Sequence, residues 1–178
     1  IHALDSTGRH RWRPVAPLAR AEAHFTAPDL AFSGHAYLDM NAGDEALENG
    51  FSSWVWSRSA LRGGGTAIFY DAVARTTTGA SIANSYAPDG TVTPLARPPL
   101  RELPGLLWRV DRSARSAQPI DAAGLKNLED TPFYTRSSFS ATIEGQACPT
   151  ISESVDLDRF AARWVQGLLP FKMPRWSK

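Results

Sequence analysis

Turn-forming residues divide this sequence into short segments, and this division restricts its fold more than any other feature. Gly, Pro, Asn and Asp recur between short apolar or alternating runs, most clearly in RGGGT (62–66) and APDGT (87–91). Runs separated in this way are typical of antiparallel β-sheets. We expect strands over residues 10–15, 19–25, 33–40, 53–59, 66–74, 80–87, 91–95, 106–111, 133–143 and 150–155.

One segment near the end has a helical pattern instead. Apolar side chains recur at spacings of three and four over residues 157–169, with Asp156 as a suitable N-cap and Pro170 as a stop. The sequence therefore predicts a mainly β fold, an antiparallel barrel or sandwich with one C-terminal amphipathic helix. That helix either packs on the sheet or lies on a membrane surface, where four tail residues would join it: Lys172, Arg175, Trp176 and Lys178.

Bulk properties exclude several classes of function. The chain has 178 residues, 43% of them apolar, and its formal net charge of +1 gives no general attraction to nucleic acid. A single cysteine, Cys148, excludes an intrachain disulfide and a multi-cysteine metal site. The four histidines lack zinc-ligand spacing, and neither a phosphate-binding loop nor a serine nucleophile motif is present. Metal, phosphate and serine-nucleophile chemistry therefore find little support in the sequence.

The stretch SGHAYLDMN (33–41) carries an unusual row of side chains. Strand alternation places four of them on one face: His35, Tyr37, Asp39 and Asn41. This face is either the solvated side of a half-buried strand or the lining of a cavity. Gly34 and Ala36 would make a poor core on the opposite face, which favours the cavity.

Other aromatic residues could join this row by the same period-two rule. His10 and Trp12 share a face in HRWR, as do Trp54 and Trp56 in SWVWS. Aromatic walls around Asp39 would disfavour its charged form and keep a carboxylic acid available as a proton donor. Aromatic ring faces can also stabilise a carbocation.

Three long segments resemble one family, the carotenoid 1,2-hydratases, also called hydroxyneurosporene synthases. They are GHAYLDMNAGDEALENGFSSWVWSRS (34–59), TAIFYDAVAR (66–75) and LDRFAARWVQGLLPFKMPRW (157–176). The resemblance implies a lipocalin-like fold and cofactor-independent addition of water to the terminal 1,2 double bond of an acyclic carotenoid, such as neurosporene or lycopene. The product would be a tertiary alcohol. We expect the protein on the cytoplasmic side of the membrane, associated with it peripherally.

The same resemblance implies roles for individual residues. Asp39 would be the catalytic acid with Tyr37 beside it, while His10 and Trp12 match the family's other functional positions. The expected substrate-binding residues are Trp54, Trp56, His35 and Asn41. Because family members are longer, residues 1–18 are expected to end, or to lead from, an N-terminal β-rich half. Residues 19–178 would then form the C-terminal lipocalin-like domain.

Two other functions fit the same residues. A lipocalin-like fold can carry an apolar ligand without catalysis, and a related isomerase or cyclase would also protonate an alkene. Asp39 buried among Trp12, Tyr37 and His10 would favour an enzyme, whereas an exposed or arginine-paired Asp39 would favour a carrier. Incorporation of water into the product separates a hydratase from an isomerase or cyclase.

Overall fold

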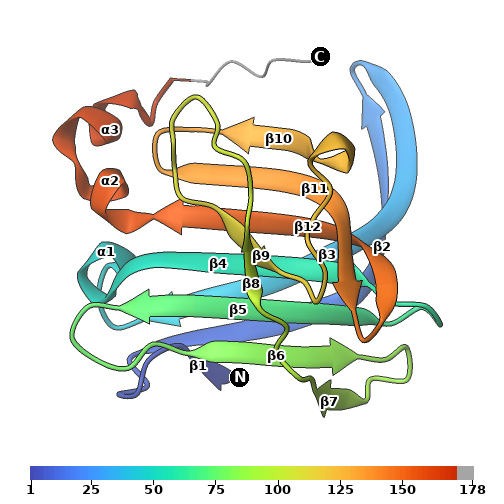
Figure 1. The fold of residues 1–178 in the computed structure, drawn as a ribbon. Coiled ribbons are helices and arrows are strands. Elements are labelled where there is room, and N and C mark those ends of the chain that lie inside the picture. Colours follow the sequence, from blue (N-terminus) through green and yellow to red (C-terminus); the bar gives the residue numbers. More distant parts are fainter. Residues whose placement is uncertain (172–178) are drawn as a thin grey trace.

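A central antiparallel sheet organises the computed structural model, which describes residues 1–171. Its strands follow the order β10-β11-β12-β4-β5-β6-β7 (Figure 1). Their bounds are Lys126–Asp130 (β10), Tyr134–Ile143 (β11), Gln146–Asp156 (β12), Phe51–Ala60 (β4), Thr66–Ala74 (β5), Ser81–Tyr86 (β6) and Val92–Pro94 (β7). Within the described residues β10 and β7 are the free edges, so the predicted antiparallel β fold is confirmed as open sheets and not as a closed barrel.

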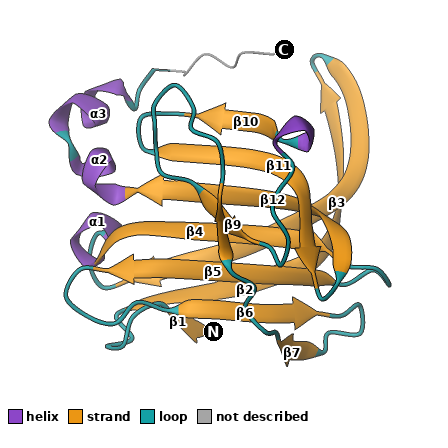
Figure 2. Ribbon diagram, viewed as in Figure 1, coloured by secondary structure: helices purple, strands orange, loops and turns teal. Residues whose placement is uncertain are grey.

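Two smaller sheets cover the faces of the central sheet. One contains His2–Ala3 (β1), His10–Thr26 (β2) and Asp29–Gly43 (β3), and the long β2–β3 hairpin crosses behind the central strands (Figures 1 and 2). The other pairs Leu100–Glu102 (β8) with Ser113–Arg115 (β9) in front of them. The result is a layered β structure with a core on each side of the central sheet.

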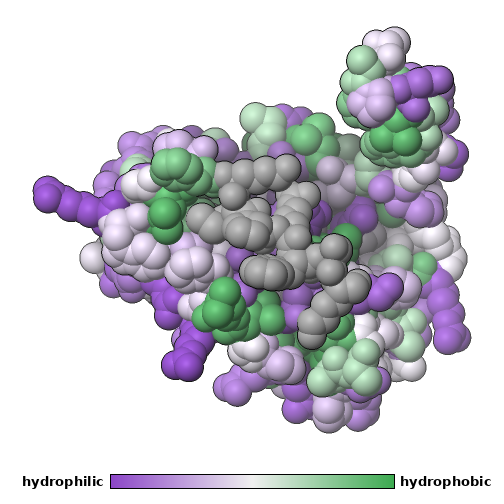
Figure 3. All heavy atoms as spheres, turned by 90° about the horizontal axis from the view of Figure 1, so that it is seen from above, coloured by the Kyte–Doolittle hydropathy of each residue, from purple (hydrophilic) through white to green (hydrophobic). Residues whose placement is uncertain are grey.

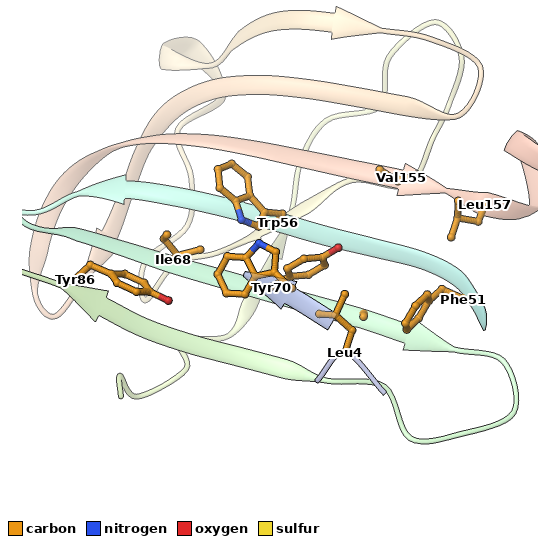
Figure 4. Close-up of a cluster of buried hydrophobic side chains, with 10 residues drawn as sticks. Leu4, Phe51, Trp56, Ile68, Tyr70, Tyr86, Val155 and Leu157 are labelled. Carbon is orange, nitrogen blue, oxygen red and sulfur yellow. The ribbon is translucent and has the colours of Figure 1, made fainter. Parts of the chain in front are cut away.

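Strand β5 shows how the sequence builds both cores. Its side chains alternate between the faces, and both sets are buried. Ile68 and Tyr70 join the cluster beneath the hairpin, with Trp56 of the neighbouring strand (Figure 4). Ala67 and Phe69 join the cluster under β8 and β9. A strand covered on both faces reads as a nearly continuous apolar run, as TAIFYDAVA does.

Most of the expected strands are present, with different limits. The segments 10–15 and 19–25 form one strand, β2, whose register shifts around Pro14 and Pro17 because proline lacks the N–H that a regular ladder needs. The boundary expected after residue 18 falls inside this strand. The strand expected at 106–111 is wrong: Arg109 has a φ of 51° and its N–H bonds to the carbonyl of Leu106, which makes a turn.

The predicted helix over 157–169 is two short helices in the structure. Leu157–Ala161 (α2) begins at Asp156, whose side chain accepts a hydrogen bond from the backbone N–H of Arg159. Ala162 is extended, with φ −67° and ψ 132°, and separates α2 from Arg163–Leu168 (α3). Buried Leu157 and Val165 attach the pair to the body of the protein.

The other helices of residues 1–171 are short as well. They are Leu47–Gly50 (α1) and the 3₁₀ turn Ala122–Gly124. No helix in the described part of the chain has the length and apolar character needed to cross a bilayer. The tail residues Lys172, Arg175, Trp176 and Lys178 lie outside the described residues.

Two glycines enclose the imidazole of His10, and this packing predicts a stability effect. A Cβ added at Gly50 would lie 2.4 Å from Cε1 of His10, and one at Gly43 would lie 2.6 Å from Cδ2. Because the ring is fully buried, it cannot move aside. Gly50→Ala should therefore lower the free energy of unfolding by about 1–3 kcal/mol. Urea denaturation measures this, with Gly34→Ala as the control because a Cβ there meets no atom within 4 Å. Equal stabilities of the two variants would contradict the packing.

Candidate active site

A cavity of about 430 Å³ lies between the hairpin and the central sheet. Five strands contribute to it: β3, β4, β5, β11 and β12. Its lining residues are His35, Ala36, Tyr37, Asp39, Asn41, Trp54, Trp56, Arg58, Tyr70, Arg136, Ile151 and Glu153. The structure thus brings together six of the eight predicted site residues as cavity lining.

The polar row of β3 faces the cavity, whereas Leu38 and Met40 between its members face outward. Leu38 and Met40 are 55% and 57% exposed, whereas Tyr37 and Asp39 are partly buried. This is the reverse of the arrangement usual for a half-buried strand. The pairing of β3 with β2 sets the orientation, because Trp12 lies opposite Asn41 and Pro14 opposite Asp39 in the register.

Two side chains hold the carboxyl group of Asp39 in place. The indole Nε1 of Trp12 donates a hydrogen bond to Oδ2 at 2.7 Å, and the hydroxyl of Tyr37 donates to the same oxygen at 2.9 Å. No arginine or lysine among residues 1–171 forms an ion pair with Asp39. Oδ1 accepts no hydrogen bond within that part of the chain and is available to a ligand. Trp12 itself is fully buried, so it acts as a support beneath the cavity.

Aromatic rings surround this carboxyl group. Tyr37 packs on Trp56 with ring centroids 5.0 Å apart, and the guanidinium of Arg58 lies 5.4 Å from the centre of the Tyr37 ring. Burial, with the nearby Asp39 carboxylate, raises the pKa of the Tyr37 hydroxyl, which stays protonated and donates. Tyr70 packs edge-on against Trp12 at 5.5 Å. These rings offer π faces beside a positioned acid.

His10 lies away from the cavity lining, although it shares a strand with Trp12. Its Nδ1 lies 2.9 Å from Oδ2 of Asp5, and its backbone N–H donates to the same oxygen at 3.0 Å. The ring packs edge-on against Phe51 at 4.8 Å. His10 therefore anchors the start of β2, and the functional role that the family resemblance implies for it stays a prediction.

Sequence reasoning missed six lining residues: Ala36, Arg58, Tyr70, Arg136, and Ile151 and Glu153 of β12. Arg58 continues the alternation of Trp54 and Trp56, so period two could have identified it. Glu153 shares a strand face with Ile151 and Val155, and a carboxyl group among apolar residues was a usable signal.

Metal and thiol chemistry find no suitable site in the described part of the chain. No group of three or more His, Cys, Asp or Glu side chains able to hold a metal occurs within residues 1–171. Cys148 is fully buried in the cluster under β8 and β9, and burial raises the pKa of its thiol. It therefore has the character of an unreactive core residue.

Comparison with known proteins gives a consistent result. The family model described as carotenoid hydratase CrtC matches residues 1–178. The chain is 43% identical over 173 residues to an acyclic carotenoid 1,2-hydratase of Thiocapsa roseopersicina, covering 97% of this chain and 42% of that protein. It is 38% identical over 175 residues to the enzyme of that name from Rubrivivax gelatinosus, covering 98% and 43%. The chain thus spans less than half the length of these two relatives.

One solved structure supports the fold. A crystal structure assigned as AttH, from Nitrosomonas europaea, aligns with a TM-score of 0.50 and 14% sequence identity. The alignment covers 83% of this chain and 51% of that one. At this identity the likeness concerns the fold alone.

Proposed function

The chain belongs to the carotenoid hydratase CrtC family, and from this we propose that it adds water to the terminal 1,2 double bond of an acyclic carotenoid. The observation that carries the proposal is the Asp39 carboxyl group, fixed by Trp12 and Tyr37 at the wall of an aromatic cavity. We propose neurosporene or lycopene as the substrate.

Asp39 starts the reaction as a carboxylic acid. Both hydrogen bonds to Asp39 end on Oδ2, so the proton is carried by Oδ1. That oxygen donates it to the less substituted carbon of the double bond, whose π electrons form the new C–H bond. The positive charge develops on the carbon that bears two methyl groups. The rings of Tyr37 and Trp56 stabilise this charge through their π faces.

Water completes the reaction by attacking the cationic carbon. The new C–O bond gives a tertiary alcohol once the attacking water loses a proton. At about 430 Å³ the cavity is suited to the end group of a carotenoid, so the rest of the polyene lies outside it. The polyene then has to be accommodated by an apolar environment beyond the cavity.

The test of the function is the fate of lycopene in water labelled with oxygen-18. We expect a monohydroxylated product that carries the label when the full-length protein is supplied with lycopene. A rearranged product without oxygen would instead indicate an isomerase or cyclase. Unchanged lycopene bound to the protein would indicate a carrier, and either result would overturn the proposal.

The β2–β3 hairpin supports a further part of the proposal, peripheral contact with the cytoplasmic face of a membrane. The hairpin projects from the body as a separate lobe (Figures 1 and 3). Near its tip Phe25, Leu30 and Phe32 are about half exposed, and the two phenyl rings stack at 6.1 Å. Exposed aromatic and aliphatic side chains of this kind insert into the interface of a bilayer.

A double variant tests the membrane contact. Phe25→Ser with Phe32→Ser should weaken co-sedimentation with phosphatidylcholine and phosphatidylglycerol vesicles at least tenfold, because two apolar side chains no longer leave water on binding. Leu107→Ser is the control, since Leu107 is 77% exposed but far from the hairpin in sequence. Equal binding of the double variant and the control would contradict the contact.

A further inference from the structure

The cavity contains a second carboxyl group, which comes from a different sheet than Asp39. Glu153 lies on β12 of the central sheet, beside Trp56 in the register, whereas Asp39 comes from β3 of the hairpin sheet. Both side chains line the same cavity, and the two acids are close enough for the Asp39 charge to act on Glu153. An alkene end group in the cavity would therefore have one carboxyl group from each sheet in its surroundings.

The surroundings of Glu153 suit a group that gains and loses a proton. Burial raises its pKa, an effect reinforced by the negative charges of Asp39 and Glu129 and opposed by a hydrogen bond with Tyr134 and by Arg136. Nε of Arg136 lies 3.5 Å from Oε1 of Glu153. Glu153 is therefore a stronger base, when ionised, than an exposed glutamate.

We propose that Glu153 is the catalytic base that accepts a proton from the water that attacks the carbocation. This inference rests on the proposed hydration and assigns the acceptor that the hydration requires. The other ionisable lining groups are less suitable. Tyr37 and Tyr70 have hydroxyls whose pKa is raised by burial, so they stay protonated, and the arginines are cations that cannot accept a proton. His35 also lines the cavity, but its side chain is exposed, whereas Glu153 is partly buried.

The proton balance closes over one cycle. Asp39 loses its proton to the alkene, water forms the C–O bond, and Glu153 takes the proton that the bound water releases. The pair then holds one proton, now on Glu153 instead of Asp39. Transfer of that proton back to Asp39 through water in the cavity restores the starting state. Two carboxyl groups that share one proton provide an acid and a base at the same pH.

This assignment predicts a bell-shaped pH dependence of kcat. At low pH Glu153 is protonated and cannot act as the base. At high pH the pair loses the proton that Asp39 must donate, so kcat falls on both sides. Because the pKa of Glu153 is raised, the acid limb should lie above the usual pH range for a glutamate. The charged and titratable groups that face Glu153 are Asp39 on β3, Arg58 on β4, Tyr70 on β5, Glu129 on β10, and Tyr134 and Arg136 on β11.

The experiment compares Glu153→Gln with wild type in the full-length protein, with lycopene as substrate. Gln keeps the shape of the side chain but cannot take the proton. We expect kcat to fall by about 10²-fold with KM within threefold of wild type, and the acid limb of the pH profile to disappear. Glu153→Asp should recover part of kcat and restore the acid limb. Glu102→Gln is the matched control, because this glutamate is exposed on β8 and should leave both limbs unchanged.

The outcomes separate this inference from the proposed function. An inactive wild-type protein would refute the hydration and with it the role of Glu153. An active wild type with a Glu153→Gln variant that keeps kcat within twofold and retains the acid limb would refute Glu153 as the base and leave the hydration standing. A loss of kcat equal in Gln and Asp variants, with both limbs kept, would show a purely structural residue and would also overturn the proposal.

Discussion

Asp39→Asn in the full-length protein is expected to reduce hydration of lycopene by about 10²–10⁴-fold, the usual contribution of a general acid. The amide keeps the size of the side chain and retains an oxygen that Trp12 and Tyr37 can hydrogen-bond, as they do Oδ2 of the carboxyl. It has no acidic proton to give to an alkene. The variant should therefore fold and bind carotenoid normally while losing turnover.

Three measurements make this expectation specific. Circular dichroism checks the fold, quenching of tryptophan fluorescence by lycopene checks binding, and product analysis gives the rate. Asp89→Asn is the matched control because Asp89 lies at an exposed turn, where Asn can also accept the hydrogen bond from the N–H of Thr91. Turnover by Asp39→Asn at the rate of Asp89→Asn would remove Asp39 from the acid role.

Trp12→Ala is expected to have the largest effect on stability, a loss of about 3–5 kcal/mol in the free energy of unfolding. The indole is fully buried, packs against Tyr70 and His2, and supplies one of the two hydrogen bonds to Asp39. Its removal leaves a void beneath the cavity, so turnover should fall with stability. Urea denaturation measures the first effect.

The controls for Trp12 separate packing from hydrogen bonding. Trp164→Ala should cost less than about 1 kcal/mol, since that ring is 53% exposed. Tyr37→Phe keeps the ring on Trp56 but removes the other donor to Asp39, which becomes charged only as it gives up its proton. A hydrogen bond to a charged group contributes about 1.5–3 kcal/mol, so the loss acts mainly on the proton-transfer step. It should therefore lower turnover about 10- to 150-fold with little change in stability. Similar stabilities of Trp12→Ala and Trp164→Ala would contradict the support role.

Much of the fold could be predicted from local sequence, because turns and alternation act over a few residues. Period two places Tyr37 and Asp39 on one face, but it cannot decide which face is buried. Leu38 and Met40 are apolar but exposed, so local hydrophobicity predicts the wrong buried face for this strand. The packing of the hairpin decides which face is buried. The break at Ala162 is likewise invisible in a pattern of apolar spacings.

What could not be predicted is that distant segments of the chain meet at the site. Glu153 and Arg136 reach the cavity because β12 returns beside β4, about a hundred residues later in the chain, and β11 follows next to it. No local pattern specifies that pairing. His10 shows the converse, since period two places it on the face of Trp12 but its contact with Asp5 fixes it at the end of the strand, outside the cavity lining.

The position of a bound carotenoid is the most direct test of the central claim that alkene protonation occurs beside Asp39. The structure offers an alternative, a smaller apolar cavity of about 180 Å³ lined by Pro132, Phe133, Val165 and Leu168 among others. In a crystal structure of the full-length protein with lycopene, the account predicts the terminal double bond within contact of Oδ1 of Asp39 and against the rings of Tyr37 and Trp56. A terminal double bond bound in the smaller cavity, or out of contact with Asp39, would contradict it.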